Sequence, residues 1–170
     1  VTADHGMKPK HNANGEPSVV YVQDLLDQWL GEAKARVILP ITDPYVVHHG
    51  ALGSFATAYL PAEVDTAEII EKLSDIEGIL LVINKSEAVK RFDLPPDRIG
   101  DIVIISTENM TLGTSVDRHD LEALKEPLRS HGGLTEQEVP FIVNRKIDLP
   151  EVPNLRNYDA FFYASIAANT

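Results

Sequence analysis

The chain has 170 residues, of which 44% are apolar and 24% charged, as in ordinary soluble globular proteins. Its formal net charge of −11 argues against nucleic acid or an anionic membrane as a partner, because both would repel it. The absence of cysteine excludes disulfides and thiolate metal sites, so any metal must be held by histidine and carboxylate side chains. It also fits a cytoplasmic protein.

The first residues form a short apolar run that breaks off at Asp4, His5 and Gly6. Adjacent carboxylate and imidazole groups at the mouth of a predicted strand favour a divalent metal site, and Gly6 allows a sharp turn past the ion. The alternative is a helix-capping aspartate beside a surface histidine, and the spacing favours neither interpretation over the other.

Lys8 and Lys10 either face an anionic substrate or, as is commoner, are solvated in a loop. Because the chain starts inside a predicted strand without an initiator methionine, we interpret it as the C-terminal part of a longer polypeptide.

The stretch from residue 18 to about residue 106 predicts strands that alternate with helices, and therefore a compact α/β unit with four strands and two or three helices. Ser18 is expected to cap a first helix that ends near Gly31. Asp65 and Glu68 have the spacing of a capping box that starts a second helix. Strands are predicted at 35–41, 54–60, 79–84 and 102–106, and a short helix at 86–92.

The last third of the chain is predicted to be more irregular. A helix is expected at 120–128, followed by a break at residues 130–133, a turn or single helical turn at 135–138 and a short strand at 141–144. The last stretch, to Ala168, has aromatic and aliphatic residues at helical spacing, which predicts a helix with these side chains facing the core. They are Tyr158, Phe161, Phe162 and Ile166.

The other histidines of the sequence are candidate metal ligands or substrate-binding residues to different degrees. His131 lies in a glycine loop between regular elements and is the second candidate, although a lone loop histidine is usually solvated. His48 and His49 are consecutive, so in an extended chain they point to opposite faces and cannot easily share one metal. One of them is a candidate to line a pocket. His11 and His119 have polar surroundings and are interpreted as ordinary structural or solvated residues.

Two of these motifs resemble a known superfamily. Residues 2–7 (TADHGM) together with residues 130–133 (SHGG) look like the last two metal-binding motifs of the alkaline phosphatase superfamily, where such segments flank an inserted cap. The longer runs 4–12, 43–50 and 129–134 resemble the phosphonoacetate hydrolase family. The resemblance implies an α/β fold: the C-terminal part of an alkaline phosphatase-like core at 1–17 and 116–170, with an inserted α/β (α+β) cap domain at 18–115.

The resemblance also implies a function. The family consists of two-zinc enzymes that cleave the carbon–phosphorus bond of phosphonoacetate, a small anionic substrate, to acetate and phosphate. Asp4 and His5 would bind the zinc that also holds the nucleophile, and His131 would bind the other zinc. The nucleophilic threonine, the remaining metal ligands and the lysines that grip the substrate would lie upstream of Val1, so no catalytic residue is assigned here. His48 or His49 would reach the substrate from the cap.

On this interpretation the isolated chain is inactive, and the complete enzyme is expected to be a homodimer. Two alternatives stay open. The closest is a nucleotide pyrophosphatase or phosphodiesterase of the same superfamily, which shares the Asp-His-Gly-Met run and a late His-Gly. The other, from a different class, is a non-catalytic fragment containing the cap, which binds a ligand or its own N-terminal half.

Overall fold

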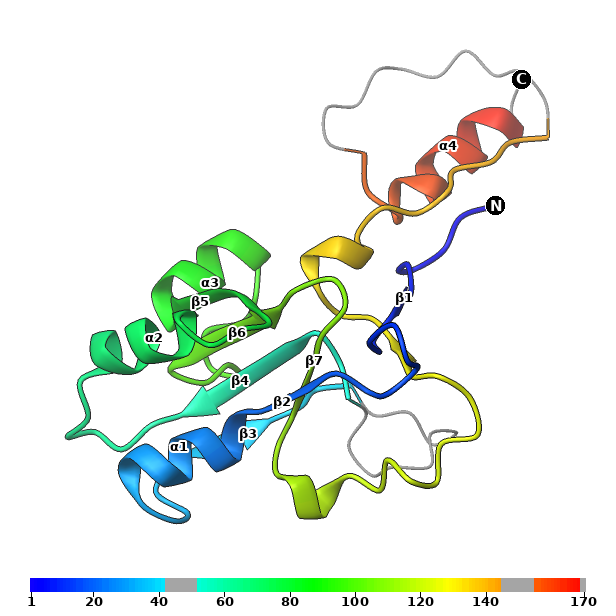
Figure 1. The fold of residues 1–170 in the computed structure, drawn as a ribbon. Helices are drawn as coiled ribbons and strands as arrows, with labels where there is room; N and C mark the ends of the chain where they lie inside the picture. Colours follow the sequence, from blue (N-terminus) through cyan, green and yellow to red (C-terminus); the bar gives the residue numbers. More distant parts are fainter. Residues whose placement is uncertain (42–51, 145–154, 169–170) are drawn as a thin grey trace.

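The structure, a computed structural model, describes residues 1–41, 52–144 and 155–168. Its centre is an antiparallel sheet of four strands in the order β3-β4-β6-β5 (Figure 1). Three helices pack on this sheet, and a fourth lies away from it. The strands are β3 (Arg36–Ile38), β4 (Phe55–Tyr59), β5 (Ile79–Asn84) and β6 (Ile102–Ser106); the helices are α1 (Val22–Leu30), α2 (Thr66–Ser74), α3 (Lys85–Phe92) and α4 (Asp159–Ala168).

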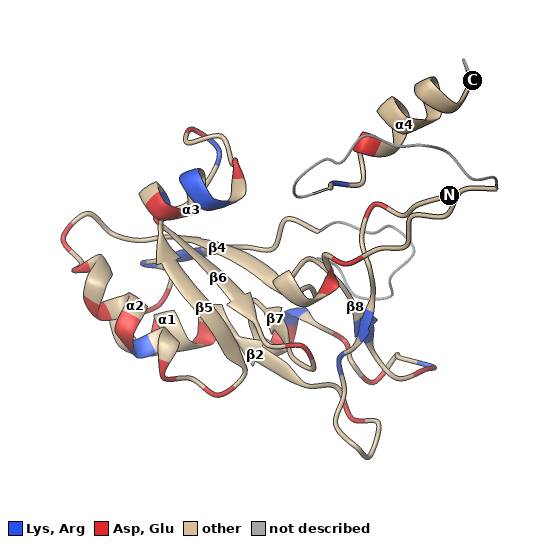
Figure 2. Cartoon of the chain, turned by 90° about the horizontal axis from the view of Figure 1, so that it is seen from above, with Lys and Arg blue, Asp and Glu red and all other residues tan. Residues whose placement is uncertain are grey.

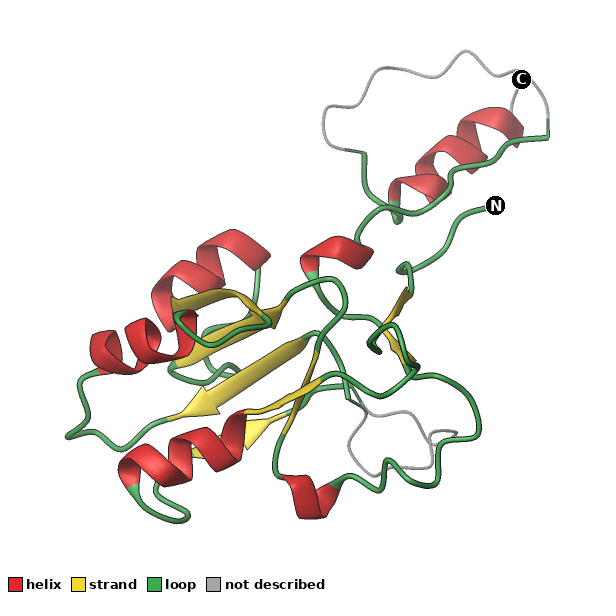
Figure 3. Ribbon diagram, in the orientation of Figure 1, coloured by secondary structure: helices red, strands yellow, loops and turns green. Residues whose placement is uncertain are grey.

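Strand β6 shows how the sheet is buried. Successive side chains of a strand point to opposite faces. Ile102 and Ile104 accordingly join the hydrophobic cluster beneath α1 and α2, whereas Val103 and Ile105 join the cluster beneath α3. Helices thus cover both faces of the sheet (Figure 3), and every residue of β6 is buried. This double cover explains why the sequence of this strand is continuously apolar.

Several predictions made from the sequence are confirmed. The strands at 79–84 and 102–106 are present with the predicted bounds, as β5 and β6, and the short helix predicted at 86–92 is α3. Asp65 is the N-cap of α2, and its carboxylate accepts a hydrogen bond from the backbone N–H of Ala67. The sequence predicts a mixed α/β unit of four strands and two or three helices, and the structure has a four-stranded sheet with three helices packed on it.

The prediction that Ser18 caps the first helix is wrong. Residues Val19–Tyr21 form strand β2, which pairs in parallel with β7 (Thr111–Gly113), and α1 begins only at Val22. The carbonyl of Ser18 accepts a hydrogen bond from the N–H of Thr111. A partner far along the chain therefore takes the backbone groups that a helix would have used, and local sequence does not reveal that partner.

Two predicted elements in the last third are also wrong. Residues 120–128 form turns instead of a helix; the nearest helical turn is Val116–Arg118. Pro127 lacks the N–H that a helix needs there, and the carbonyl of Leu128 accepts a hydrogen bond from the N–H of Lys10 instead. Residues 141–144 are not a strand, although Ile142 exchanges backbone hydrogen bonds with Val1. The expected single helical turn is present at Leu134–Glu136.

Helix α4 is present where the sequence predicts a final helix, but three of the side chains predicted to face the core, Tyr158, Phe161 and Phe162, do not. Phe161 is 81% exposed, and Phe162 and Tyr158 are more than half exposed. Tyr163 is buried, with its ring edge-on to Phe141. The helix lies beside the N-terminus, apart from the four-stranded sheet, and Figure 2 shows that it carries almost no charge. None of the described helices has the length and apolarity needed to cross a membrane.

Candidate metal centre

A short antiparallel ladder brings the two candidate metal motifs together. Strand β1 (Lys8–Pro9) pairs with β8 (Arg129–Ser130), with Lys8 opposite Ser130 and Pro9 opposite Arg129. The first motif ends just before β1, and His131 follows directly after β8. Because the strands run in opposite directions, the residues before one and after the other leave the ladder at the same end. The start of the chain and the glycine loop near residue 131 therefore border one site.

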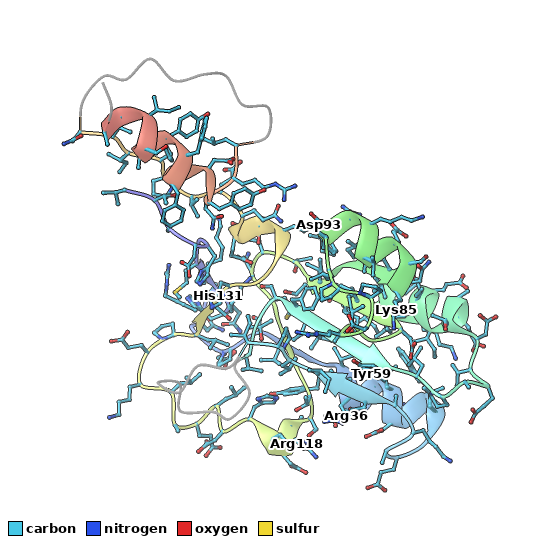
Figure 4. All side chains as sticks on the ribbon, turned by 180° about the vertical axis from the view of Figure 1, so that it is seen from behind. Arg36, Tyr59, Lys85, Asp93, Arg118 and His131 are labelled. Carbon is cyan, nitrogen blue, oxygen red and sulfur yellow. The ribbon has the colours of Figure 1, made fainter. Side chains whose placement is uncertain are left out.

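The imidazole rings of His5 and His131 stack on each other. Their centroids are 3.6 Å apart and their planes differ by only 9°. Figure 4 shows His131 at the junction between the sheet and the segment that leads to α4. The structure thus brings together the two histidines that the sequence singled out.

Hydrogen bonds fix the orientation of His5. Its Nδ1 lies 2.8 Å from the carbonyl oxygen of Gly6, which can only accept, so Nδ1 carries a hydrogen and the neutral ring has its lone pair on Nε2. That Nε2 lies 3.7 Å from a carboxylate oxygen of Asp4, whose side chain is 85% exposed. The other carboxylate oxygen of Asp4 accepts a hydrogen bond from the backbone N–H of His5. Asp4 and His5 therefore direct free donor atoms to the same side of the loop.

This donor set fits a zinc site in chemistry but is incomplete. Zinc binds imidazole nitrogen and carboxylate oxygen and usually takes four ligands. The described residues contain no group of three or more histidines and carboxylates able to hold a metal together. A zinc ion bound here would therefore need ligands besides these residues.

A buried ion pair lies behind the two loops, and the sequence did not indicate it. Lys10, interpreted from the sequence as solvated or substrate-facing, is 0% exposed, and its ammonium lies 3.0 Å from Oε1 of Glu136, which is 2% exposed. Burial lowers the pKa of Lys10, while the hydrogen bond to Glu136 opposes this shift. Burial acts to raise the pKa of Glu136, but hydrogen bonds from Thr135, Lys10 and the Gly133 amide outweigh it, so that this pKa is lowered. The carboxylate is therefore held ionised.

The neighbouring lysine is different. Lys8 forms an ion pair with Glu108 at 2.6 Å, and both side chains are substantially exposed. The hydrogen bond with Glu108 raises the pKa of Lys8. Lys8 is thus a surface residue, as the commoner interpretation of the sequence has it, and it provides a natural comparison for Lys10.

An open cavity of about 980 Å³ adjoins the paired histidines. Asp4, His5 and Gly133 are among the residues that line it, and so are Lys90 and Arg91 of α3. A small anionic molecule has room there, and the lining includes cationic side chains.

Among the described residues, His11 and His119 make contacts away from this site. His119 is buried, and its Nε2 accepts a hydrogen bond from the backbone N–H of Thr114, while His11 lies 2.9 Å, through Nδ1, from the carbonyl of Asn12. Both interactions are structural, as interpreted from the sequence. His48 and His49, the candidate substrate-binding residues, lie outside the described residues.

Comparison with known proteins finds solved structures that are similar to this chain over nearly its whole length. Two crystal structures of phosphonoacetate hydrolase from Sinorhizobium meliloti 1021, one in complex with phosphonoformate and one in complex with phosphonoacetate, match with a TM-score of 0.89 and 70% sequence identity. Each match covers 98% of this chain and 41% of that chain, so the chain spans less than half the length of these relatives. A murine ectonucleotide pyrophosphatase/phosphodiesterase 5 matches over 78% of this chain at 20% identity, with a TM-score of 0.48, which does not establish a common fold. No protein-family model matches the chain.

The fold is that of part of an alkaline phosphatase superfamily protein. Within that superfamily, the chain is a close homologue of a C-terminal part of phosphonoacetate hydrolase. The resemblance expected from residues 2–12, 43–50 and 129–134 is therefore confirmed.

Proposed function

We propose that this chain forms part of a zinc-dependent hydrolase that cleaves the carbon–phosphorus bond of phosphonoacetate to give acetate and phosphate. The stacking of His5 on His131, at 3.6 Å between centroids, is the observation that carries the proposal. It unites two motifs that serve one metal centre in the superfamily. The 70% identity to an enzyme crystallised with phosphonoacetate supports the choice of substrate.

The proposed ligands are Asp4 and His5 for one zinc ion and His131 for the other. When bound, two zinc ions supply positive charge that binds the phosphonate and stabilises the attacking oxygen. The chain's own contribution is orientation: the Gly6 carbonyl holds His5 in the tautomer that leaves Nε2 free. The net charge of −11 does not prevent anion binding at such a site, because bound cations dominate the local field.

Positive charge must also offset the negative charge of the substrate. Phosphonoacetate carries a carboxylate besides the phosphonate, and negative charge grows on the acetate group as the carbon–phosphorus bond breaks. Lys90, Arg91 and Arg156 line the same cavity as His5 and are candidates to face that charge. The nucleophile and the remaining ligands belong to a part of the enzyme that this chain does not contain, and we propose that the complete enzyme is a cytoplasmic homodimer.

The test uses a chimera. This chain replaces the 41% of the Sinorhizobium enzyme that it matches, and phosphate release is measured with phosphonoacetate, a nucleotide phosphodiester and a phosphate monoester. We expect phosphonoacetate to be the preferred substrate, with activity lost after chelation and restored by zinc. The intact Sinorhizobium enzyme is the positive control.

Two results would contradict the proposal. Preference for the nucleotide diester would indicate the pyrophosphatase class. A folded chimera that turns over none of the three substrates, beside an active parent, would make the chain a non-catalytic module.

A further inference from the structure

Lys10 and Glu136 occupy equivalent places in the two halves of the site. Lys10 lies five residues after His5, and Glu136 lies five residues after His131. Their side chains meet at 3.0 Å and are shielded from solvent, with 0% and 2% of each residue exposed. The pair is thus a bridge between the segments that carry the two histidines.

Glu136 binds the backbone of both histidine loops. Its own carbonyl accepts a hydrogen bond of 2.7 Å from the N–H of Gly6, the residue after His5. Its carboxylate Oε2 accepts a hydrogen bond of 2.8 Å from the N–H of Gly133, two residues after His131. One residue therefore fixes the backbone on both sides of the stacked imidazoles.

Lys10 anchors this arrangement to the rest of the fold. Its ammonium also donates to the carbonyl of Glu108 at 2.6 Å, and its backbone N–H donates to the carbonyl of Leu128 at 2.8 Å. There is little free space around these hydrogen bonds. A Cβ added at Gly133 would lie 2.8 Å from Oε2 of Glu136, and a Cβ added at Gly6 would lie 3.1 Å from the carbonyl oxygen of Glu136.

A gain in folding stability does not by itself explain why this ion pair is buried. Two charges removed from water recover their desolvation cost only with good geometry, and well-packed apolar residues of the same size often stabilise a protein as well or better. Apolar residues could not, however, accept the hydrogen bond from Gly133 or attract one segment to the other in a fixed register. Groups that orient metal ligands from behind typically change metal affinity when they are removed.

We propose that Lys10 and Glu136 are positioning residues, which hold the loops of His5 and His131 in register so that both imidazoles are arranged for metal binding before the metal arrives. The statement about zinc binding rests on the proposed function. The statement that the pair holds the two loops does not, because it can be tested on the chain without metal.

The first experiment therefore uses the metal-free 170-residue chain and measures amide hydrogen exchange in wild type, Lys10→Met and Lys8→Met. In Lys10→Met we expect exchange at Gly6 and Gly133 to become at least about tenfold faster, while amides in α2 and β5 keep their rates. Lys8→Met, which removes the exposed ion pair two residues away, should match wild type at every site. Unchanged rates at Gly6 and Gly133 in Lys10→Met would overturn the proposal.

The second experiment measures zinc affinity in the chimera by competition with a chelator. Lys10→Met is expected to weaken zinc binding by about 10- to 100-fold, and Lys8→Met to leave it within about twofold. Because Lys10→Met leaves Glu136 as an unpaired buried charge, the double variant Lys10→Met/Glu136→Gln removes both charges at similar volume and keeps the chain folded. A folded double variant with wild-type zinc affinity would refute positioning. A wild-type chimera without zinc would instead refute the proposed function, and the exchange experiment would still decide the role of the pair.

Discussion

His5 lies face to face with His131, with 3.6 Å between ring centroids, although one comes from the start of the chain and the other from its last quarter. The relationship depends on two backbone features. The β1–β8 ladder aligns the segments, and Glu136 fixes the loops beyond it through Gly6 and Gly133.

Removal of a proposed ligand should remove metal. In the chimera, His131→Ala and Asp4→Ala are each expected to lose at least one zinc ion per molecule, measured by elemental analysis of the purified protein. The matched control is His11→Ala, which removes a histidine of the same N-terminal segment whose Nδ1 lies 2.9 Å from the backbone carbonyl of Asn12. Retention of two zinc ions in either test variant would contradict the ligand assignment.

The isolated chain should not turn over substrate. The described residues hold an incomplete donor set, and no nucleophile is assigned in this chain. We therefore expect the purified 170-residue protein to release no phosphate from phosphonoacetate above the rate of buffer with zinc, at any zinc concentration that keeps it soluble. Turnover that is abolished by His5→Ala would show that this chain is sufficient for activity.

The comparison of sequence and structure shows which kinds of signal are local. Strands β5 and β6 are predictable because each contains a run of consecutive apolar residues, 79–83 and 102–105, and the Asp65 cap is predictable because it acts within one turn. Ser18 was misassigned because its backbone binds Thr111, far along the chain.

The candidate site likewise contains features that short motifs predict and features that depend on residues far apart in the sequence. Short motifs predict Asp4, His5 and His131 as metal ligands, and the structure brings the two histidines together, but no motif predicts that Lys10 is buried. A buried lysine depends on its partner, and Glu136 lies in a different motif with no sequence feature that links the two. The orientation of α4 was also wrong, since helical spacing of Phe161 and Phe162 predicts an apolar face without saying what covers it.

The stabilising contribution of Glu136 should depend on acid pH. The pKa of this carboxyl is lowered in the folded chain, so the folded state binds its proton less readily than the unfolded state does. The contribution is therefore fully present above the ordinary carboxyl pKa of about 4.3 and is lost as the pH falls through the lower folded value. Chemical unfolding of wild type and Glu136→Gln should show a difference in stability at pH 7 that shrinks below about pH 4. A difference that does not change with pH would show that Glu136 acts only through its shape.

Helix α4 offers a pair of aromatic residues with opposite environments. Phe161 is 81% exposed, so Phe161→Ala should change the free energy of unfolding by no more than about 0.5 kcal/mol. Tyr163 is 4% exposed and packs edge-on against Phe141, so Tyr163→Ala should cost about 3 kcal/mol. Urea unfolding of the two variants measures both values. Equal costs would mean that α4 does not pack as described.

Gly132 should tolerate no side chain, because its backbone is left-handed and its surroundings are crowded. Its φ is +98°, and an added Cβ would lie 2.8 Å from Cδ1 of Ile41. Gly132→Ala is expected to destabilise the chain by about 1–2 kcal/mol from the backbone conformation alone, and by more if Ile41 cannot move. Gly15→Ala is the matched control, since Gly15 has a φ of +85° with no atom within 4 Å of the added Cβ. The difference between the unfolding free energies of the two variants in urea isolates the steric part of the destabilisation.

Because Gly132 directly follows His131, Gly132→Ala should also disturb the imidazole stack. The ring proton chemical shifts of His5 and His131 would report this disturbance. Unchanged shifts in a destabilised Gly132→Ala would show that the glycine serves the fold and not the geometry of the histidine pair.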